Sequence, residues 1–195
     1  TVPEGNRVIA SGLEAGSSAT GSGNVTYAFQ TTRPAFPGSI AVVRGEPAHA
    51  AAEGVSTMLY FRQDKAALAG AYGHEAARIM TFLTSLYGIP PRADLVVVET
   101  EAGAPNGYAA EGILFLAPSA ISGEVNSRVL ANQLARQWWG HLVSPSTRDH
   151  LWITNGAARY SELLYIEHGA GAAAFEAELR DTYVEALTVD QPPLI

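Results

Sequence analysis

The chain has 195 residues, of which 47% are hydrophobic and 16% are charged, and its formal net charge is −7. This composition is typical of a soluble globular protein and too apolar for a disordered segment. With Lys65 as the only lysine and no basic stripe, the sequence argues against nucleic acid as a partner. The absence of cysteine excludes disulfides and thiolate chemistry. No apolar run reaches the roughly 18 residues that a membrane helix needs.

The first part of the chain is rich in Gly, Ser and Ala. We expect residues 1–24 to be a linker or a loose hairpin. Residues 1–39 as a whole then form a linker and the end of a preceding β region, and residues 40–195 form a separate domain. Because the chain begins with Thr1, we expect a processed or excised piece of a longer protein. The sequence does not determine the cellular compartment, although it weakly favours an extracytoplasmic location.

The next part of the chain alternates strand and helix signals. Asp64 is the expected N-cap of a long amphipathic helix that ends at Gly88. Residues 101–112 are rich in Gly, Ala and Pro and predict a loop. The expected strands are 25–30, 40–44, 55–62, 95–98 and 113–116.

The last part of the chain carries helical patterns alone. Helices are expected over 126–140, 154–168 and from about 172 to 187. An order of strands with one helix, followed by helices only, is typical of an α+β fold. We therefore expect a small mixed sheet packed on helices.

Residues 132–140 carry the most informative motif, Asn-Gln-Leu-Ala-Arg-Gln-Trp-Trp-Gly. It resembles the zinc helix of the aminopeptidase N family of zinc metallopeptidases (gluzincins), which reads His-Glu-Leu-Ala-His-Gln-Trp-Trp-Gly. In that family the two histidines share one helix face and bind zinc, and the glutamate activates the metal-bound water. The resemblance implies the thermolysin-like (zincin) catalytic domain over residues 40–195.

The spacing from this motif to the position of the family's third zinc ligand also matches the family. The family places a zinc-binding glutamate in Trp-Leu-Asn-Glu-Gly, 19 residues after the second histidine. Here the same count from Arg136 reaches Asn155, within the Trp-Ile-Thr-Asn-Gly of residues 152–156. Upstream, residues 86–98 resemble the family's Tyr-Phe-Gly-Ile-Pro-Tyr segment and the strand after it.

The residues at the zinc positions differ from those of the family. The vestigial ligand positions are Asn132, Arg136 and Asn155, and Gln133 stands at the position of the catalytic base. Amide oxygens are poor zinc ligands, a guanidinium has no acceptor, and glutamine cannot take a proton. We therefore expect no bound zinc, no other cofactor and no hydrolysis by that mechanism. We also expect Arg136 to fill the space of the ion and to meet Asn155.

The family's next landmark is Gly-Ala-Met-Glu-Asn, an edge-strand motif that binds the free amine of the substrate. The corresponding loop is 103–112, where the glutamate of the motif falls on Asn106 or Ala109. A peptide partner is expected to add to an edge strand near 113–116. The residues expected to line this cleft are Asn106, Gly107, Tyr108, Ala109, Glu111 and Ile113.

Several alternatives stay open beside the hypothesis of an inactive homologue. The chain is an active metallopeptidase if its metal site is rearranged, for example around His141 and His150, or is completed by missing domains. A structural spacer or scaffold is the third hypothesis. Glu99, Glu101 and Glu111 are candidates for binding a cationic amine, with solvated loop carboxylates as the alternative. Trp138 and Trp139 are expected in the core.

Overall fold

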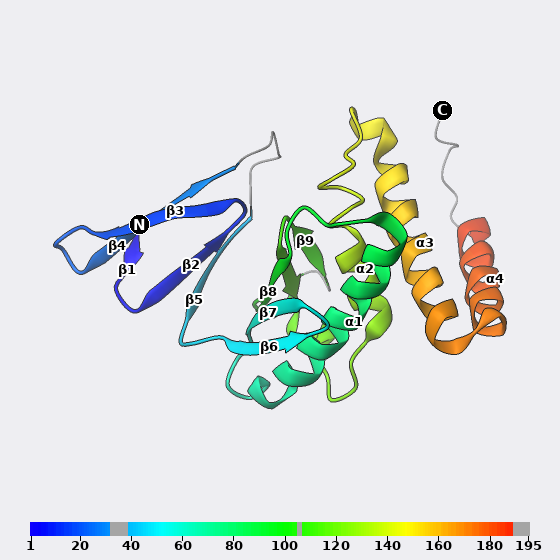
Figure 1. Ribbon diagram of the computed structural model, residues 1–195, viewed down its shortest axis with the longest axis horizontal. Coiled ribbons are helices and arrows are strands. Elements are labelled where there is room, and N and C mark those ends of the chain that lie inside the picture. The colour runs from blue at the N-terminus through cyan, green and yellow to red at the C-terminus, as the bar shows by residue number, and fades with distance from the viewer. Residues whose placement is uncertain (32–38, 105–106, 189–195) are drawn as a thin grey trace.

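The structure is a computed structural model that describes residues 1–31, 39–104 and 107–188 (Figure 1). Its strands are β1 (Val2–Pro3), β2 (Asn6–Ala10), β3 (Leu13–Ala19), β4 (Asn24–Gln30), β5 (Ile40–Arg44), β6 (Ala48–Ala52), β7 (Val55–Tyr60), β8 (Asp94–Glu99), β9 (Tyr108–Ala110) and β10 (Ile113–Leu116). Its α-helices are α1 (Ala69–Tyr87), α2 (Ser127–Ala135), α3 (Leu151–Ala170) and α4 (Ala172–Thr188), with 3-10 turns at Ala66–Leu68, Pro118–Ala120 and Arg148–His150.

The central element is a five-stranded mixed sheet in the order β6-β7-β8-β10-β9. β7, β8 and β10 run parallel, whereas β6 and β9 pair antiparallel with their neighbours at the two edges. Helix α1 makes the long connection from β7 to β8 that parallel strands require. The expected α+β fold, a mixed sheet packed on helices, is confirmed.

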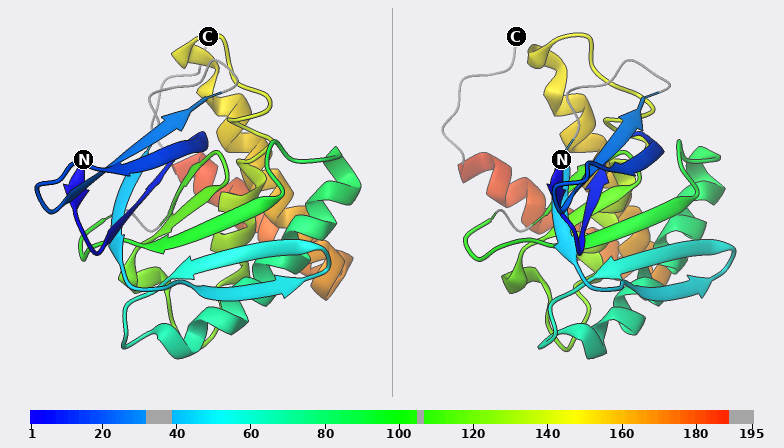
Figure 2. Two further views of the ribbon diagram at one scale, coloured as in Figure 1. Left: turned by 60° about the vertical axis from the view of Figure 1, so that its left-hand side comes forward. Right: turned by 90° about the vertical axis from the view of Figure 1, so that its left-hand side faces the viewer.

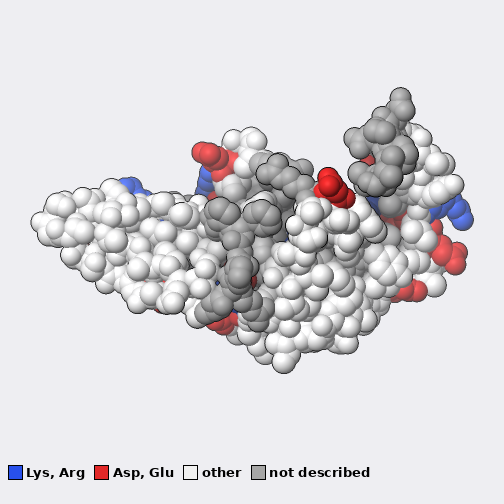
Figure 3. All heavy atoms as spheres, turned by 90° about the horizontal axis from the view of Figure 1, so that it is seen from above, with Lys and Arg blue, Asp and Glu red and all other residues white. Residues whose placement is uncertain are grey.

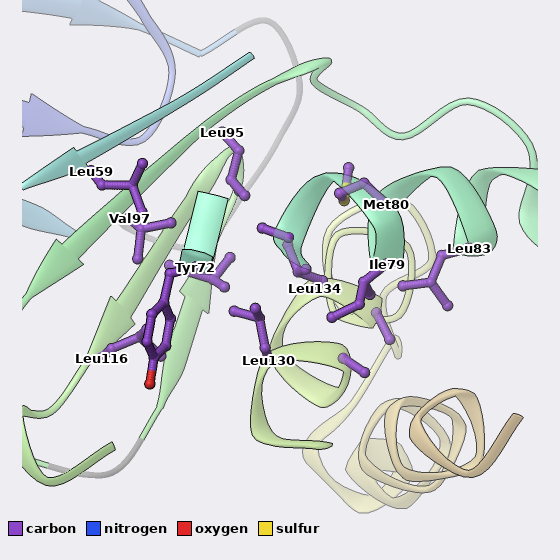
Figure 4. Close-up of a cluster of buried hydrophobic side chains, with 14 of the residues drawn as sticks. Leu59, Tyr72, Ile79, Met80, Leu83, Leu95, Val97, Leu116, Leu130 and Leu134 are labelled. Atoms are coloured by element: carbon purple, nitrogen blue, oxygen red, sulfur yellow. The ribbon is translucent and has the colours of Figure 1, made fainter. Parts of the chain in front are cut away.

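One face of the sheet packs against α1 and α2. Side chains of a strand alternate between the two faces of its sheet. Leu95 and Val97 of β8 point to the helical side, where they join Ile79 of α1 and Leu130 and Leu134 of α2 in one buried cluster (Figure 4). This cluster fixes α2 against the sheet.

The N-terminal strands β2 and β5 cover the opposite face. Val96 and Val98 of β8 point to this side and cluster with Ile9 of β2, and Val43 of β5 packs against them. The run 95–98 is therefore apolar throughout because β8 is buried on both faces.

Residues 1–31 contain the strands β1 to β4, so of the two alternatives for residues 1–24, a linker or a loose hairpin, the structure has the hairpin (Figures 1 and 2). β3 and β4 form an antiparallel hairpin, and β1 pairs with β4. The Gly/Ser-rich composition suits this hairpin, since its register shifts between Glu14 and Gly16 as in a β-bulge. β2 pairs with β5, so this strand pair joins residues from both sides of the predicted boundary after residue 39. The division into 1–39 and 40–195 stays a prediction.

Helix α1 begins later than the sequence suggests. It starts at Ala69 after a 3-10 turn, with Leu68 at the N-cap and no side-chain cap, so Asp64 is not its N-cap. The favourable packing of the helix on the sheet offsets the missing cap. Its predicted end is confirmed, because Gly88 follows with a φ of 81°, which favours glycine.

Helix α2 ends at Ala135 rather than at residue 140. The backbone N–H groups of Gln137 and Trp138 bond to carbonyls three residues back, which tightens the chain into turns. The two last helices are α3 and α4, separated by Gly171 with a φ of 83°. α3 lies between α2 and α4 (Figure 1).

Charged side chains are sparse on the face that Figure 3 shows. Acidic and basic residues lie close together at its helical end, and the visible atoms there form no continuous basic surface. Within the described ranges, no helix combines the length and apolar character that crossing a membrane requires.

Candidate functional site

Helices α2 and α3 bring two of the predicted positions together. Arg136, at the C-cap of α2, donates a hydrogen bond from Nη1 to Oδ1 of Asn155 on α3, at 3.0 Å. This contact confirms the prediction that the two positions meet. Trp138 fixes the chain that follows, because its buried Nε1 donates to the carbonyl oxygen of Gly88 at 3.0 Å. Trp138 lies in the core and Trp139 packs against it, as expected.

Asn132 and Gln133 lie on the same helix, one turn before Arg136. The Asn132 amide donates from Nδ2 to Oε2 of Glu162 on α3 at 3.2 Å. The Gln133 amide donates from Nε2 to Oδ1 of Asn132 at 3.5 Å, while its Oε1 is buried without a hydrogen-bond partner among the described residues. Asn132, Arg136 and Asn155 therefore lie on the facing sides of α2 and α3, and Gln133 lies beside Asn132.

Glu162 belongs to the site although no motif in the sequence singles it out. Only 4% of it is exposed. Besides the Asn132 amide, its carboxylate accepts hydrogen bonds from Nε of Arg128 at 3.0 Å and from Nη1 of Arg159. It follows Asn155 by seven residues, two helical turns on the same face, and this spacing is the signal that could have found it.

The charge of Arg136 is only partly solvated. Burial lowers the pKa of its guanidinium from the ordinary value, though arginine stays protonated at any working pH. Burial also lowers the pKa of the nearby His141, and the charge of Arg136 lowers it further. The hydrogen-bonding contact of His141 with the carbonyl of Ala109 and the charge of Glu111 act in the opposite direction. The guanidinium thus carries positive charge beside an imidazole whose pKa is lowered.

The open edge of the sheet at this site is β9, not the segment 113–116. β10 lies between β8 and β9, since the loop expected over 101–112 contains a short strand that folds back on it. Just before β9, Gly107 lies against Gln133, so close that an added Cβ would stand 2.9 Å from the Gln133 side chain. The edge strand thus runs beside the α2 positions.

Gln137 ties this edge to the helix. The residue is 1% exposed, and its Nε2 donates to the carbonyl of Ala110 at 2.9 Å. Its Oε1 accepts from the backbone N–H of Gly112 at 2.8 Å. One carboxamide thereby holds both sides of the β9–β10 turn against the end of α2.

Five of the six residues expected to line a peptide cleft are described, and they lie in three places. Gly107, Tyr108 and Ala109 lie on or next to β9, where Tyr108 is 55% exposed and Ala109 is buried. Glu111 lies in the β9–β10 turn. Ile113 is 2% exposed and points into the core, so its place in the cleft is wrong. Asn106 lies outside the described residues.

The three carboxylates proposed to bind an amine do not gather. Glu99 pairs with Leu116 at the far end of β10, whereas Glu111 precedes the start of that strand. Glu99 is buried and accepts a hydrogen bond from the backbone N–H of Arg62 at 2.7 Å, with Lys65 at 3.9 Å. It stabilises the sheet end rather than facing the α2 site.

The two candidate histidines have separate partners. Nε2 of His141 lies 3.4 Å from the carbonyl oxygen of Ala109, and Nδ1 of His150 lies 2.9 Å from Oγ1 of Thr147. In the parts of the chain that the structure describes, no three His, Asp or Glu side chains lie close enough to hold a metal ion. These positions do not support the rearranged metal site.

The donor set at α2 and α3 does not fit the zinc ion that the resemblance implies. Zinc takes lone pairs from imidazole, thiolate or carboxylate. Asn132 and Asn155 offer amide oxygens, and the guanidinium of Arg136 repels a divalent cation. Gln133 has no basic group with which to accept a proton.

Comparisons with known proteins point to aminopeptidases. The chain is 24% identical over 151 residues to endoplasmic reticulum aminopeptidase 2 of Bos taurus, covering 72% of this chain and 16% of that protein. It is 37% identical over 67 residues to leucine aminopeptidase 2 of Candida albicans, 34% of this chain and 11% of that protein. No family model matches. The chain thus spans about a sixth or less of these relatives.

Solved structures share the fold. The M1 zinc metallopeptidase of Deinococcus radiodurans superposes with a TM-score of 0.74 at 24% identity, over 99% of this chain and 44% of that one. A point mutant of that enzyme, bound to a Tyr-Ser-Ala substrate, gives a TM-score of 0.72 at 23% identity, over 99% and 45%. The chain is therefore similar in sequence to parts of these aminopeptidases and shares the fold of the solved M1 zinc metallopeptidase.

Proposed function

We propose that the chain is a non-catalytic homologue of the zinc aminopeptidases that binds a peptide along β9. The observation that carries the proposal is the hydrogen bond between Arg136 and Asn155, two positions that the family uses for zinc. A guanidinium there supplies positive charge without a Lewis acid or an exchangeable water. The amide of Gln133 supplies no base. The chain therefore lacks both the metal ligands and the general base that the family uses for hydrolysis.

Peptide binding is supported by the position of the open edge. β9 lies beside α2 and exposes Tyr108, and an extended peptide can add to such an edge through main-chain hydrogen bonds. The related Deinococcus enzyme was solved with a Tyr-Ser-Ala substrate. A scaffold role without any ligand is the competing form of the same proposal.

Metal content and turnover test the loss of catalysis. The protein, purified without chelator, is analysed for zinc and assayed on amino-acid anilides before and after incubation with zinc. We expect well below one zinc per chain and no turnover above the buffer rate. One equivalent of zinc, or zinc-dependent hydrolysis abolished by chelator, would favour an active enzyme with a rearranged site.

Peptide binding is tested separately by titrating 15N-labelled protein with Tyr-Ser-Ala. We expect the amide resonances of β9 to shift with a Kd below about 1 mM, on the order of −4 kcal/mol. The opposite sheet edge, β6, is the internal control and should not shift. If the resonances of neither edge shift, peptide binding along β9 is contradicted and the scaffold role is favoured.

A further inference from the structure

Arg136 differs from the other arginines between α2 and α3 in what it contacts. Arg128 and Arg159 both donate to the carboxylate of Glu162. Among the described residues, Arg136 donates only to the neutral amide oxygen of Asn155, and no carboxylate lies within ion-pair distance of it. A guanidinium has five N–H donors, so most of its donors are not used.

This arrangement leaves a positive charge that is incompletely compensated. Removing a charge from water costs free energy unless an opposite charge or several hydrogen bonds replace the solvent. Burial alone lowers the pKa of Arg136, and no carboxylate offsets it. A carboxylate is the natural complement, because its two oxygens match the paired N–H groups of a guanidinium.

The neighbouring side chains also suit a ligand here. Gln133 lies three residues before Arg136, on the same side of α2, and has a buried polar oxygen with no partner among the described residues. Its side chain contacts Gly107, the residue before β9. His141 contacts the carbonyl of Ala109 in β9 and is close enough to Arg136 for the charge to act on it. Arg136 therefore lies within reach of a chain that runs along β9.

We propose that Arg136 binds a carboxylate of the peptide that pairs with β9, so that this site recognises acidic ligands. The inference rests on the proposed function for the location of the peptide, and adds the chemical class of its recognised group. The carboxylate is either the C-terminal group of a short peptide or an acidic side chain.

Three matched peptides distinguish these sources. Tyr-Ser-Ala carries a terminal carboxylate, Tyr-Ser-Ala-amide carries none, and Tyr-Ser-Glu-amide carries only a side-chain carboxylate. Each is titrated by calorimetry into the parent protein, into Arg136→Gln and Arg136→Lys, and into Arg180→Gln as a control with the same loss of charge on α4. Circular dichroism and thermal unfolding verify that each variant is folded.

We expect at least one carboxylate peptide to bind the parent about tenfold more tightly than the neutral amide, equal to about 1.4 kcal/mol. Arg136→Gln should abolish this preference, Arg136→Lys should retain part of it because the point charge remains, and Arg180→Gln should leave it unchanged. Equal affinities of all three peptides for the parent would overturn the inference while leaving peptide binding intact.

Sodium acetate, titrated against a sodium chloride control, tests the carboxylate site without a peptide. We expect acetate to shift the Nε–H resonance of Arg136 saturably and to leave that of Arg180 unaffected. A shift by acetate without any peptide binding would support the carboxylate site and overturn the peptide-binding part of the proposed function. No shift with acetate, together with no carboxylate preference, overturns the inference itself.

Discussion

The guanidinium of Arg136 donates to the amide oxygen of Asn155 at 3.0 Å, across 19 residues of sequence and between two helices. Under the proposed function these two positions correspond to the zinc ligands of the aminopeptidases, and here a hydrogen bond joins them directly. The arrangement of the two helices is stabilised by their buried residues and by the bonds of Glu162 to Arg128 and Asn132.

Rebuilding the zinc positions tests this preserved arrangement. The quadruple change Asn132→His, Gln133→Glu, Arg136→His and Asn155→Glu should bind zinc at least about 100-fold more tightly than the parent, since two imidazoles and a carboxylate then converge. Glu162, next to position 132, can accept the second N–H of the new imidazole and orient it.

The measurement is calorimetric titration with zinc, and the same variant without Asn155→Glu is the control for the third ligand. Hydrolysis should stay very low, because the amine-binding glutamate of the family's edge motif has no described counterpart. If the quadruple variant binds zinc no better than about 1 mM, the ligand positions do not converge as inferred.

Glu162 should matter more for stability than the other acidic partner of Arg128. Glu162→Gln removes a buried carboxylate from two arginines and Asn132, and we expect the free energy of unfolding to fall by about 2–3 kcal/mol, at the low end for buried pairs because both arginines are partly exposed. Glu178→Gln, which breaks only the partly exposed pair with Arg128, should cost less than about 1 kcal/mol. Urea unfolding measures both, and equal effects would contradict the central role of Glu162.

The contact of α1 with β6 gives a test of the fold. A Cβ added at Gly73 would stand 2.3 Å from Cβ of Ala50, so Gly73→Ala should lower the free energy of unfolding by about 1–3 kcal/mol. Gly70→Ala, in the same helix with nothing within 4 Å, should instead stabilise by up to about 1 kcal/mol. Adding Ala50→Gly to Gly73→Ala should recover part of the loss, and additive effects in this double-mutant cycle would place the two residues apart.

His141 predicts a pH dependence of stability. Its pKa is lowered in the folded chain, chiefly by burial, so below the ordinary value of 6.5 the unfolded chain binds the additional proton. Stability should therefore fall as the pH is lowered from about 7 toward 5, and His141→Gln should flatten this slope. Urea midpoints at several pH values provide the measurement, with His74→Gln on the exposed side of α1 as control. An unchanged slope in His141→Gln would show that other groups cause it.

The sequence predicts the elements whose signals are local. The run at 95–98 and the strand at 113–116 are found as expected, and the glycine at 88 ends α1 as its conformation requires. The motif around 132–140 and the spacing to Asn155 predict the contact of α2 with α3, because a motif fixes which helix faces meet.

Other features depend on contacts between distant parts of the chain, which local sequence patterns do not encode. The Gly- and Ser-rich residues 1–24 look like a linker, yet their strands are held by pairing within the N-terminal sheets and by β5. The short strand β9 has only three residues, and its pairing with β10 rather than its sequence defines it. The predicted continuation of α2 to residue 140 is wrong, because the backbone N–H groups of Gln137 and Trp138 bond to carbonyls three residues back instead of four.

The carboxamide of Gln137 has a mechanical consequence. It joins the chain just after α2 to the last residue of β9 and to the β9–β10 turn through two buried hydrogen bonds. A shift of this segment without the hairpin would break both hydrogen bonds, so they favour a fixed position of the sheet edge relative to the backbone of Arg136. A ligand that contacts both meets a surface whose parts are already aligned, so its binding requires little further loss of conformational entropy from the protein.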